Sequence, residues 1–270
     1  MRKESIFLFL GILLPMSCVQ AKSLQTTSKC KATMLTEKSS LKVKLKGMQE
    51  QVQRAFYTDM TLHKDEELSH LIHQLTAAAE GRSASGVQLI AYWQSYALYY
   101  NAIYYMQHQQ LDKASEAVTK GISLLENRDQ KTSEDYAMLS RLEGLSLAFA
   151  DSKAAQLSHT MMEHSALAIE LDSSNPRAYV VAAIGDFFTP KAYGGRTRVK
   201  ALLTKALELP TQVVKSDYNP SWGREEAYEY LLRYLLEEEG GKGAKELLDK
   251  ALVEFPYSYQ LRSINIKPNP

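Results

Sequence analysis

The sequence is poor in cysteine and proline, and both shortages restrict the fold. Its 270 residues include only two cysteines and eight prolines. Two cysteines cannot form a disulfide framework, so the folded state must depend on packing. No proline occurs between Met16 and Asn175, a gap that is typical of consecutive long helices because proline interrupts helical hydrogen bonding. This pattern argues against a β-sandwich or a β-barrel.

An excess of charge of one sign is also lacking. Lysine and arginine number 32 and aspartate and glutamate 31, so the formal net charge is +1. We expect no extended basic surface that could neutralise a nucleic-acid backbone, and nucleic acid is not a predicted partner. Hydrophobic residues make up 45% of the chain, which excludes disorder as its main state. No metalloprotease, nucleophile-elbow or dinucleotide motif occurs, so we predict no catalytic residues, no metal and no cofactor.

The first residues have the features of a secretory signal peptide, which we place at residues 1–21. Arg2 and Lys3 give a basic start, Ile6–Leu14 is apolar apart from one glycine, and Ala21 offers a small residue for cleavage. The apolar run is shorter than the roughly 20 residues that span a bilayer, and no other run approaches that length. We therefore predict an exported protein, in the periplasm or on the periplasmic face of a bacterial membrane.

Two processing routes are open. Leu14–Cys18 resembles the lipobox of bacterial lipoproteins, in which Cys18 is acylated and tethers the protein to the membrane. Ordinary cleavage after Ala21 would instead remove Cys18. On either route Cys30 has no partner within the chain. Residues 22–37 are expected to form a flexible polar leader, whose lysines provide either a soluble tether or a contact with anionic lipid.

Apolar residues that recur at intervals of three and four predict helices along almost all of the remaining chain. The first two helices, within residues 38–84, are predicted to form an N-terminal cap. Residues 85–257 are predicted to form a helical array, followed by a tail at 258–270. The expected helices, about ten in number, lie near 38–57, 61–80, 86–108, 111–126, 133–150, 153–171, 176–188, 197–209, 223–239 and 242–254.

An internal repeat of about 34 residues is the strongest pattern in the chain. One copy begins at Ser95 and another at Glu225, and neither needs an insertion. A third copy, from Pro176, carries four extra residues in the stretch Thr189–Arg196, and the segment 133–171 is a looser pair. Small residues stand where two helices of a pair touch, at Ala102, Ala114 and Gly121 in the Ser95 copy and at Ala244 and Ala251 in the Glu225 copy.

This spacing resembles the tetratricopeptide repeat (TPR) over roughly residues 90–257. The resemblance implies a right-handed superhelix of antiparallel helix pairs, an all-α fold whose concave groove binds other molecules. Asn175–Tyr179, Phe188–Pro190 with Tyr193–Gly195, and Pro220–Gly223 further resemble a family of exported TPR-like envelope proteins from Bacteroidetes-type bacteria. That narrower resemblance implies an exported protein with a conserved inter-helix loop.

Aromatic residues crowd one predicted helix. Six of the 16 tyrosines, together with Trp93, lie between residues 92 and 105. In TPR proteins, fixed positions on the first helix of each pair line the groove, and tyrosine suits that task because it offers rigid apolar area with a polar tip. The tyrosine stripe and the repeat register together give the candidate partner-binding residues Tyr92, Tyr96, Tyr99, Ile103, Arg177, Val180 and Arg233. The alternative is that the tyrosines pack against the N-terminal pair.

Three other patterns favour a structural role over chemistry. The loop Thr189–Arg196 precedes a helix and offers backbone amides to an anion, but its glycines are also what a tight turn requires. His70 and His73 share a helix face without the further ligands that zinc needs. Neighbouring glutamates at 225–226 and 237–239 diverge along a helix, so we interpret them as solvated faces and helix caps.

These features predict a non-enzymatic scaffold of the cell envelope that binds a protein or peptide in its concave groove. Tyr96 and Tyr99 would supply hydrophobic anchors, and Arg177 and Arg233 would select carboxylates or other acceptors. The alternative is a small-solute-binding accessory component of an envelope transport system. An enclosed pocket would favour the small solute, and an open groove would favour the peptide.

Overall fold

The fold is all-α, as the sequence predicts. The computed structural model describes residues 44–80 and 83–266, which contain eleven α-helices and no strand. Short 3-10 turns occur at Leu147–Phe149, Asp151–Lys153 and Lys191–Tyr193. The helices are α1 (Met48–Leu62), α2 (Glu67–Ala79), α3 (Ala84–Gln107), α4 (Leu111–Glu126), α5 (Ser133–Ser146), α6 (Ala154–Leu171), α7 (Pro176–Phe188), α8 (Val199–Glu208), α9 (Arg224–Glu238), α10 (Ala244–Glu254) and α11 (Tyr259–Arg262). The predicted signal peptide, Cys18 and the leader lie outside the described residues.

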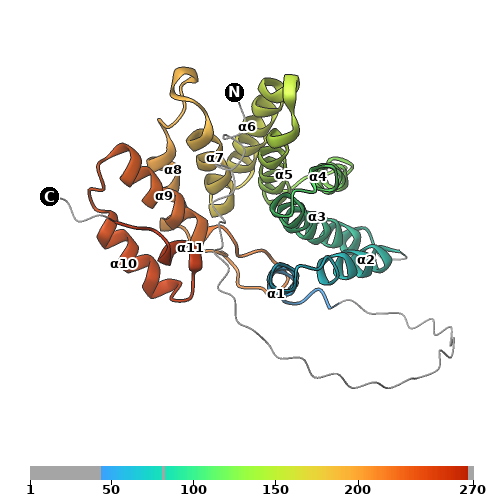
Figure 1. Ribbon diagram of the computed structural model, residues 1–270. Coiled ribbons are helices and arrows are strands. Elements are labelled where there is room, and N and C mark those ends of the chain that lie inside the picture. Colours follow the sequence, from blue (N-terminus) through green and yellow to red (C-terminus); the bar gives the residue numbers. More distant parts are fainter. Residues whose placement is uncertain (1–43, 81–82, 267–270) are drawn as a thin grey trace, which may run out of the picture.

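Consecutive helices pack as antiparallel pairs, and the pairs stack into a curved, solenoid-like array (Figure 1). Small residues make these pairs close, as the repeat pattern requires. Ala102 and Ala114 are fully buried between α3 and α4. A Cβ at Gly121 would lie 3.2 Å from the Leu142 side chain, and Ser95 donates a hydrogen bond to the Gly121 carbonyl at 2.9 Å. A larger residue at Gly121 would therefore separate α4 from its neighbours.

The end of α1 and the start of α2 lie later than predicted, and one carboxylate fixes the start of α2. The sequence predicts a helix over 61–80, but α1 continues to Leu62 and the chain turns at His63, whose φ is 52°. Asp59, on α1, then accepts hydrogen bonds from the backbone amides of Glu66, Glu67 and Leu68 at 3.3, 3.0 and 2.9 Å. These amides have no partner within α2, so Asp59 caps α2 from the preceding helix.

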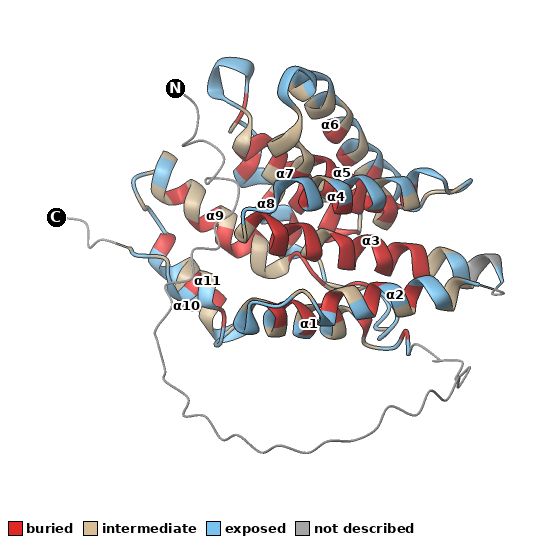
Figure 2. Cartoon of the chain, turned by 45° about the vertical axis from the view of Figure 1, so that its right-hand side comes forward, coloured by how far each residue is buried: buried red, intermediate tan, exposed pale blue. Residues whose placement is uncertain are grey.

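Two hydrophobic clusters form the core. The larger joins α1 to α5 with one side of α6 and α7 and with Trp222, and it includes α3, which is buried along most of its length (Figure 2). The smaller joins α7 to α11. The short helix α11 lies in the segment expected to be a tail and contributes Leu261, which is fully buried, to this second cluster.

The long connection between α8 and α9, residues 209–223, returns to the beginning of the fold. The Gly47 amide donates to the Asp217 carbonyl at 2.7 Å, and the Ser221 amide donates to the Gln49 side chain at 2.8 Å. Trp93, on α3, donates from its indole nitrogen to the Tyr218 carbonyl at 3.2 Å. These contacts hold α1 and α3 beside the chain that leads into α9 (Figure 1).

Candidate ligand-binding cavity

A cavity of about 1090 Å³ lies on the inner side of the curved array. Its walls come from both ends of the described chain: α1 and α3 on one side, α5, α6 and α7 in the middle, and α9, α10 and α11 on the other. Trp222, at the end of the 209–223 connection, also lines it. The cavity therefore exists because that connection joins the first helices to the later ones.

Aromatic and sulfur-containing side chains form much of the wall. Phe56 on α1 meets Tyr100 on α3, with ring centroids 5.1 Å apart. On the opposite side Phe188 and Tyr230 make an edge-on contact at 5.9 Å. The remaining aromatic and methionine residues of the wall are Tyr57, Tyr99, Tyr193, Trp222, Phe255, Met161 and Met162. Such walls suit the apolar and aromatic faces of an organic molecule.

Arg141, on α5, is the buried cation of the cavity. Its guanidinium carbon lies 4.4 Å from the centre of the Tyr99 ring and 4.3 Å from that of the Trp222 ring. Nη2 donates to Glu226 at 2.8 Å, and the side chain of Arg141 is only 10% exposed. Nε and Nη1 are buried and have no hydrogen-bond partner among the described residues, and the same holds for the hydroxyl of neighbouring Ser140.

Further carboxylates line the cavity from α9, the helix that carries Glu226. Burial raises the pKa of Glu229 to about 7; the ion pair with Arg233 at 2.7 Å lowers it, and nearby Glu226 and Glu225 raise it further. Burial also raises the pKa of Glu225. Near neutral pH Glu229 therefore carries less negative charge than an exposed glutamate would.

Two of the predicted groove residues on α3, Tyr92 and Tyr96, lie in the core instead. They are 4% and 0% exposed. The Tyr92 hydroxyl accepts a hydrogen bond from Trp222 at 2.9 Å, and Gln53 on α1 donates to the Tyr96 hydroxyl at 3.5 Å. This placement corrects the expectation that both residues face a groove, because α1 and the 209–223 connection cover that face of α3. Tyr99 and Ile103 do line the cavity.

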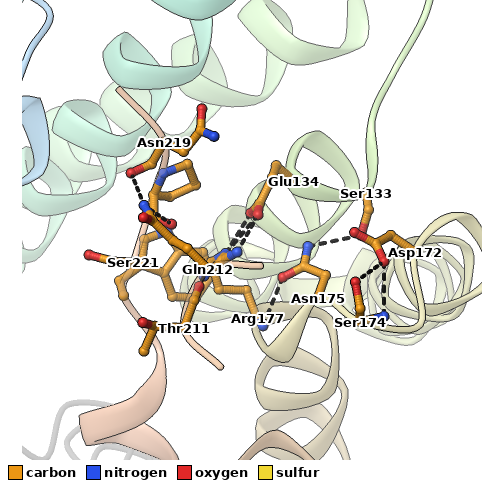
Figure 3. A network of polar contacts seen from close by, with 12 residues as sticks. Ser133, Glu134, Asp172, Ser174, Asn175, Arg177, Thr211, Gln212, Asn219 and Ser221 are labelled. Carbon is orange, nitrogen blue, oxygen red and sulfur yellow. Dashed lines mark hydrogen bonds and ion pairs between the residues drawn. The ribbon is translucent and has the colours of Figure 1, made fainter. Parts of the chain in front are cut away.

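Arg177 belongs to a buried polar network that joins α5 to α7 (Figure 3). Nε donates to both carboxylate oxygens of Glu134 at 2.9 and 2.7 Å, and Nη1 donates to the Thr211 carbonyl at 2.7 Å. Asn175 accepts from the Arg177 amide and donates to Ser133. The side chain of Arg177 is 5% exposed and lines a smaller cavity of about 430 Å³, not the larger one.

The other two predicted residues lie near the larger cavity without lining it. Val180 is fully buried in the second hydrophobic cluster. Arg233 pairs with Glu229, and its guanidinium lies 5.5 Å from the Tyr230 ring, so it acts on the cavity through these two lining residues. Of the seven predicted positions, two line the cavity, three lie in the core, one belongs to the polar network, and Arg233 lies beside the cavity without lining it.

Sequence reasoning missed Arg141 and Trp222. Arg141 lies in the segment 133–171, whose repeat spacing is irregular, so no register assigned it to the concave side. Trp222 lies outside any helix. A tryptophan directly before a helix start was the available signal, but its contact with Arg141 depends on the path of the 209–223 connection.

The cations of the 189–196 loop form ion pairs with glutamates near the end of α9. Lys191 pairs with Glu238 at 2.5 Å, and Arg196 pairs with Glu237 and Glu238 at 2.6 and 2.8 Å. Gly194 takes a left-handed conformation with φ of 83°, as a tight turn requires. Within residues 44–80 and 83–266 no group of three or more histidine, cysteine or acidic residues is arranged to hold a metal ion.

The fold and cavity together define a helical, solenoid-like protein with a ligand-sized hollow on its inner side. Neither the protein-family models nor the curated proteins compared with the chain gave a match. Among solved structures, the chain is similar to the HusA haemophore from Porphyromonas gingivalis, with a TM-score of 0.49 and 22% sequence identity over 71% of this chain and 94% of that one. None of the described helices combines the length and apolar character needed to cross a membrane.

Proposed function

We propose that the protein is a non-enzymatic binding protein whose central cavity takes a small, largely apolar organic ligand. The observation that carries the proposal is the cavity itself, about 1090 Å³ in volume and lined by aromatic rings from α1, α3, α7 and α9. This volume lies at the upper end of the range of typical small-molecule sites. Buried polar groups at a few points of an apolar wall are the usual means of orienting such a ligand.

A short peptide segment is the second candidate, and the size of the cavity favours it. A volume of about 1090 Å³ accommodates more than a single compact solute. Peptide N–H groups would find acceptors in Glu225 and Glu229 on α9, and apolar side chains would meet the aromatic wall. In this case the array acts as a TPR-like scaffold, as the repeat spacing predicts.

The compartment is part of the same proposal. We infer export through the signal peptide, with either a lipid anchor on Cys18 or a soluble periplasmic form. Cells labelled with a traceable fatty acid should yield labelled protein from the wild type and unlabelled protein from Cys18→Ala. Label on both proteins, or on neither, would exclude the anchor.

The cavity is tested by filling it. Ala155 and Ser158 line the cavity from one face of α6, whereas Gln156 and His159 are exposed on the same helix and do not line it. We expect Ala155→Trp/Ser158→Trp to weaken binding of the neutral dye phenylnaphthylamine at least about fivefold by occupying its volume. Gln156→Trp/His159→Trp should bind as the wild type does.

The titration is repeated with haemin, whose flat macrocycle presents apolar faces to aromatic side chains. The structurally similar protein is named a haemophore, which makes haemin a natural test ligand. An unlabelled peptide library measured by competition against the dye covers the second candidate. If the wild type binds none of these probes saturably, or if both double variants behave alike, the cavity is not a binding site.

A further inference from the structure

The guanidinium of Arg141 has aromatic contacts and a single hydrogen-bonded nitrogen, Nη2. Tyr99 and Trp222 contact its two faces, and Glu226 accepts from Nη2. Nε and Nη1 each have no acceptor, although both atoms are buried. Aromatic rings that lie over the faces of a guanidinium stabilise its charge. They do not accept hydrogen bonds from the N–H groups, which point outward in the plane of the guanidinium.

A buried donor without an acceptor is unfavourable, so these two nitrogens need an explanation. Arg141 belongs to the cavity wall, and the adjacent Ser140, whose hydroxyl is also buried without a partner, lines the same cavity. The N–H groups of a guanidinium form two forks, Nε with Nη2 and Nη1 with Nη2, and each fork matches two oxygens of one acid group. Nη1 is therefore the unpaired end of the second fork, whose other end, Nη2, donates to Glu226.

We propose that Arg141 binds an anionic oxygen group of the cavity's ligand, a carboxylate or a sulfonate, through Nη1. This inference rests on the proposed function and adds the chemical class of the ligand: an aromatic or apolar body that carries an acid group. Tyr99 and Trp222 hold the guanidinium plane in place. Because Nη1 is covered, the acid group reaches it only if a neighbouring side chain of the cavity wall moves.

The neighbouring carboxylates do not prevent this contact. Glu226 is neutralised by Arg141 itself, and Glu254, also in the wall, pairs with Arg224 at 2.5 Å. Glu229 pairs with Arg233. Burial raises the pKa of Glu229 to about 7, which reduces the repulsion that an incoming anion meets near neutral pH.

Glu226 competes with the ligand for the same guanidinium. Removing Glu226 and removing Arg141 should therefore change the affinity for an anionic ligand in opposite directions. Glu226→Gln removes the competing charge but keeps an oxygen that can accept from the Gly223 amide, the bond that now fixes this side chain at 3.0 Å. Anion binding should therefore strengthen. Arg141→Met removes the donors and should weaken it. A purely structural role for the Arg141–Glu226 pair would weaken binding in both variants.

Two fluorescent dyes that differ by a single acid group make the measurement. Anilinonaphthalenesulfonate carries a sulfonate on the skeleton of the neutral phenylnaphthylamine. We expect the wild type to bind the sulfonate about tenfold more tightly than the neutral dye, as a charge-assisted contact implies. Arg141→Met should abolish this preference by weakening binding of the sulfonate far more than binding of the neutral dye, and Glu226→Gln should enlarge it.

The results separate the inference from the proposed function. If neither dye binds the wild type saturably, the cavity proposal fails and the inference fails with it. If both dyes bind equally and neither variant changes their ratio, the cavity stands and the role of Arg141 is refuted. Near-ultraviolet circular dichroism and thermal unfolding of each variant confirm native packing. Should Arg141→Met not fold, Glu226→Gln still decides, because unchanged or weaker sulfonate binding overturns the proposal.

Discussion

The buried ion pair between Arg177 and Glu134 offers the sharpest test of how the array is held together. Arg177→Met keeps much of the apolar stem but removes the donors to Glu134 and to the Thr211 carbonyl. The carboxylate of Glu134 then remains at the junction of α5 and α7 without its partner. The same substitution also frees the start of the 209–223 connection, which carries Trp222 to the cavity.

The magnitude follows from burial. Removing one partner of a buried pair costs about 3–5 kcal/mol, because the other charge stays desolvated. The Glu134 side chain is 26% exposed, so water recovers part of that loss. We expect the free energy of unfolding to fall by about 2–4 kcal/mol, equivalent to a fall in Tm of roughly 5–12 °C for a domain of this size.

Equilibrium unfolding in urea, followed by circular dichroism, measures the change. Lys245→Met is the matched control, because Lys245 pairs with Asp249 on an exposed helix surface and should change stability by less than about 0.5 kcal/mol. A loss below about 1 kcal/mol in Arg177→Met would refute the reasoning. So would weaker phenylnaphthylamine binding in a fully stable variant, which would instead favour the groove contact that the repeat register predicts for Arg177.

Three further predictions concern single groups. In the folded protein Glu229 keeps its proton up to a pKa of about 7, whereas the ordinary value is 4.5. The free energy of unfolding should therefore fall by up to about 3 kcal/mol as the pH rises from 4.5 to 7. Urea titrations of Glu229→Gln should show that this pH dependence is lost. A Cβ on Gly195 would lie 1.9 Å from the Thr189 carbonyl oxygen, so Gly195→Ala should lower stability in thermal unfolding by more than about 2 kcal/mol. Gly194→Ala is strained only by its positive φ and should lower stability by about 1 kcal/mol. Equal losses of stability in the two variants would contradict this prediction. Asp59→Ala should lower the free energy of unfolding by about 2 kcal/mol and speed amide hydrogen exchange at the start of α2. Asp59→Asn should have an intermediate effect. Unchanged exchange in Asp59→Ala would show that Asp59 does not cap α2.

The local structure could be predicted because it depends on residues close in sequence. Apolar periodicity gave ten helices near their observed positions, and small residues such as Ala114 and Gly121 marked where helices touch. The errors arose at contacts between distant segments. The break between α1 and α2 depends on Asp59 reaching three amides beyond the end of its own helix, and α11 is stabilised by burying Leu261 against a cluster formed earlier in the chain.

The candidate site was predicted only in part, for the same physical reason. Periodicity identifies which residues share a helix face, but it does not say what covers that face. On α3, Tyr99 and Ile103 border the cavity while Tyr96, from the same stripe, is covered by α1. The polar atoms that distinguish the cavity belong to Arg141, which no repeat register placed on the inner side.

The sequence by itself determined the all-α class and the pairing of neighbouring helices, because hydrogen bonding within a helix and close packing of adjacent small residues are local properties. Tertiary structure decided which aromatic side chains are core and which form a wall. It did so through the 209–223 connection, which brings Trp222 to Tyr92 and Arg141, residues 130 and about 80 positions away along the chain. Contacts of such long range leave no periodic signal in the sequence.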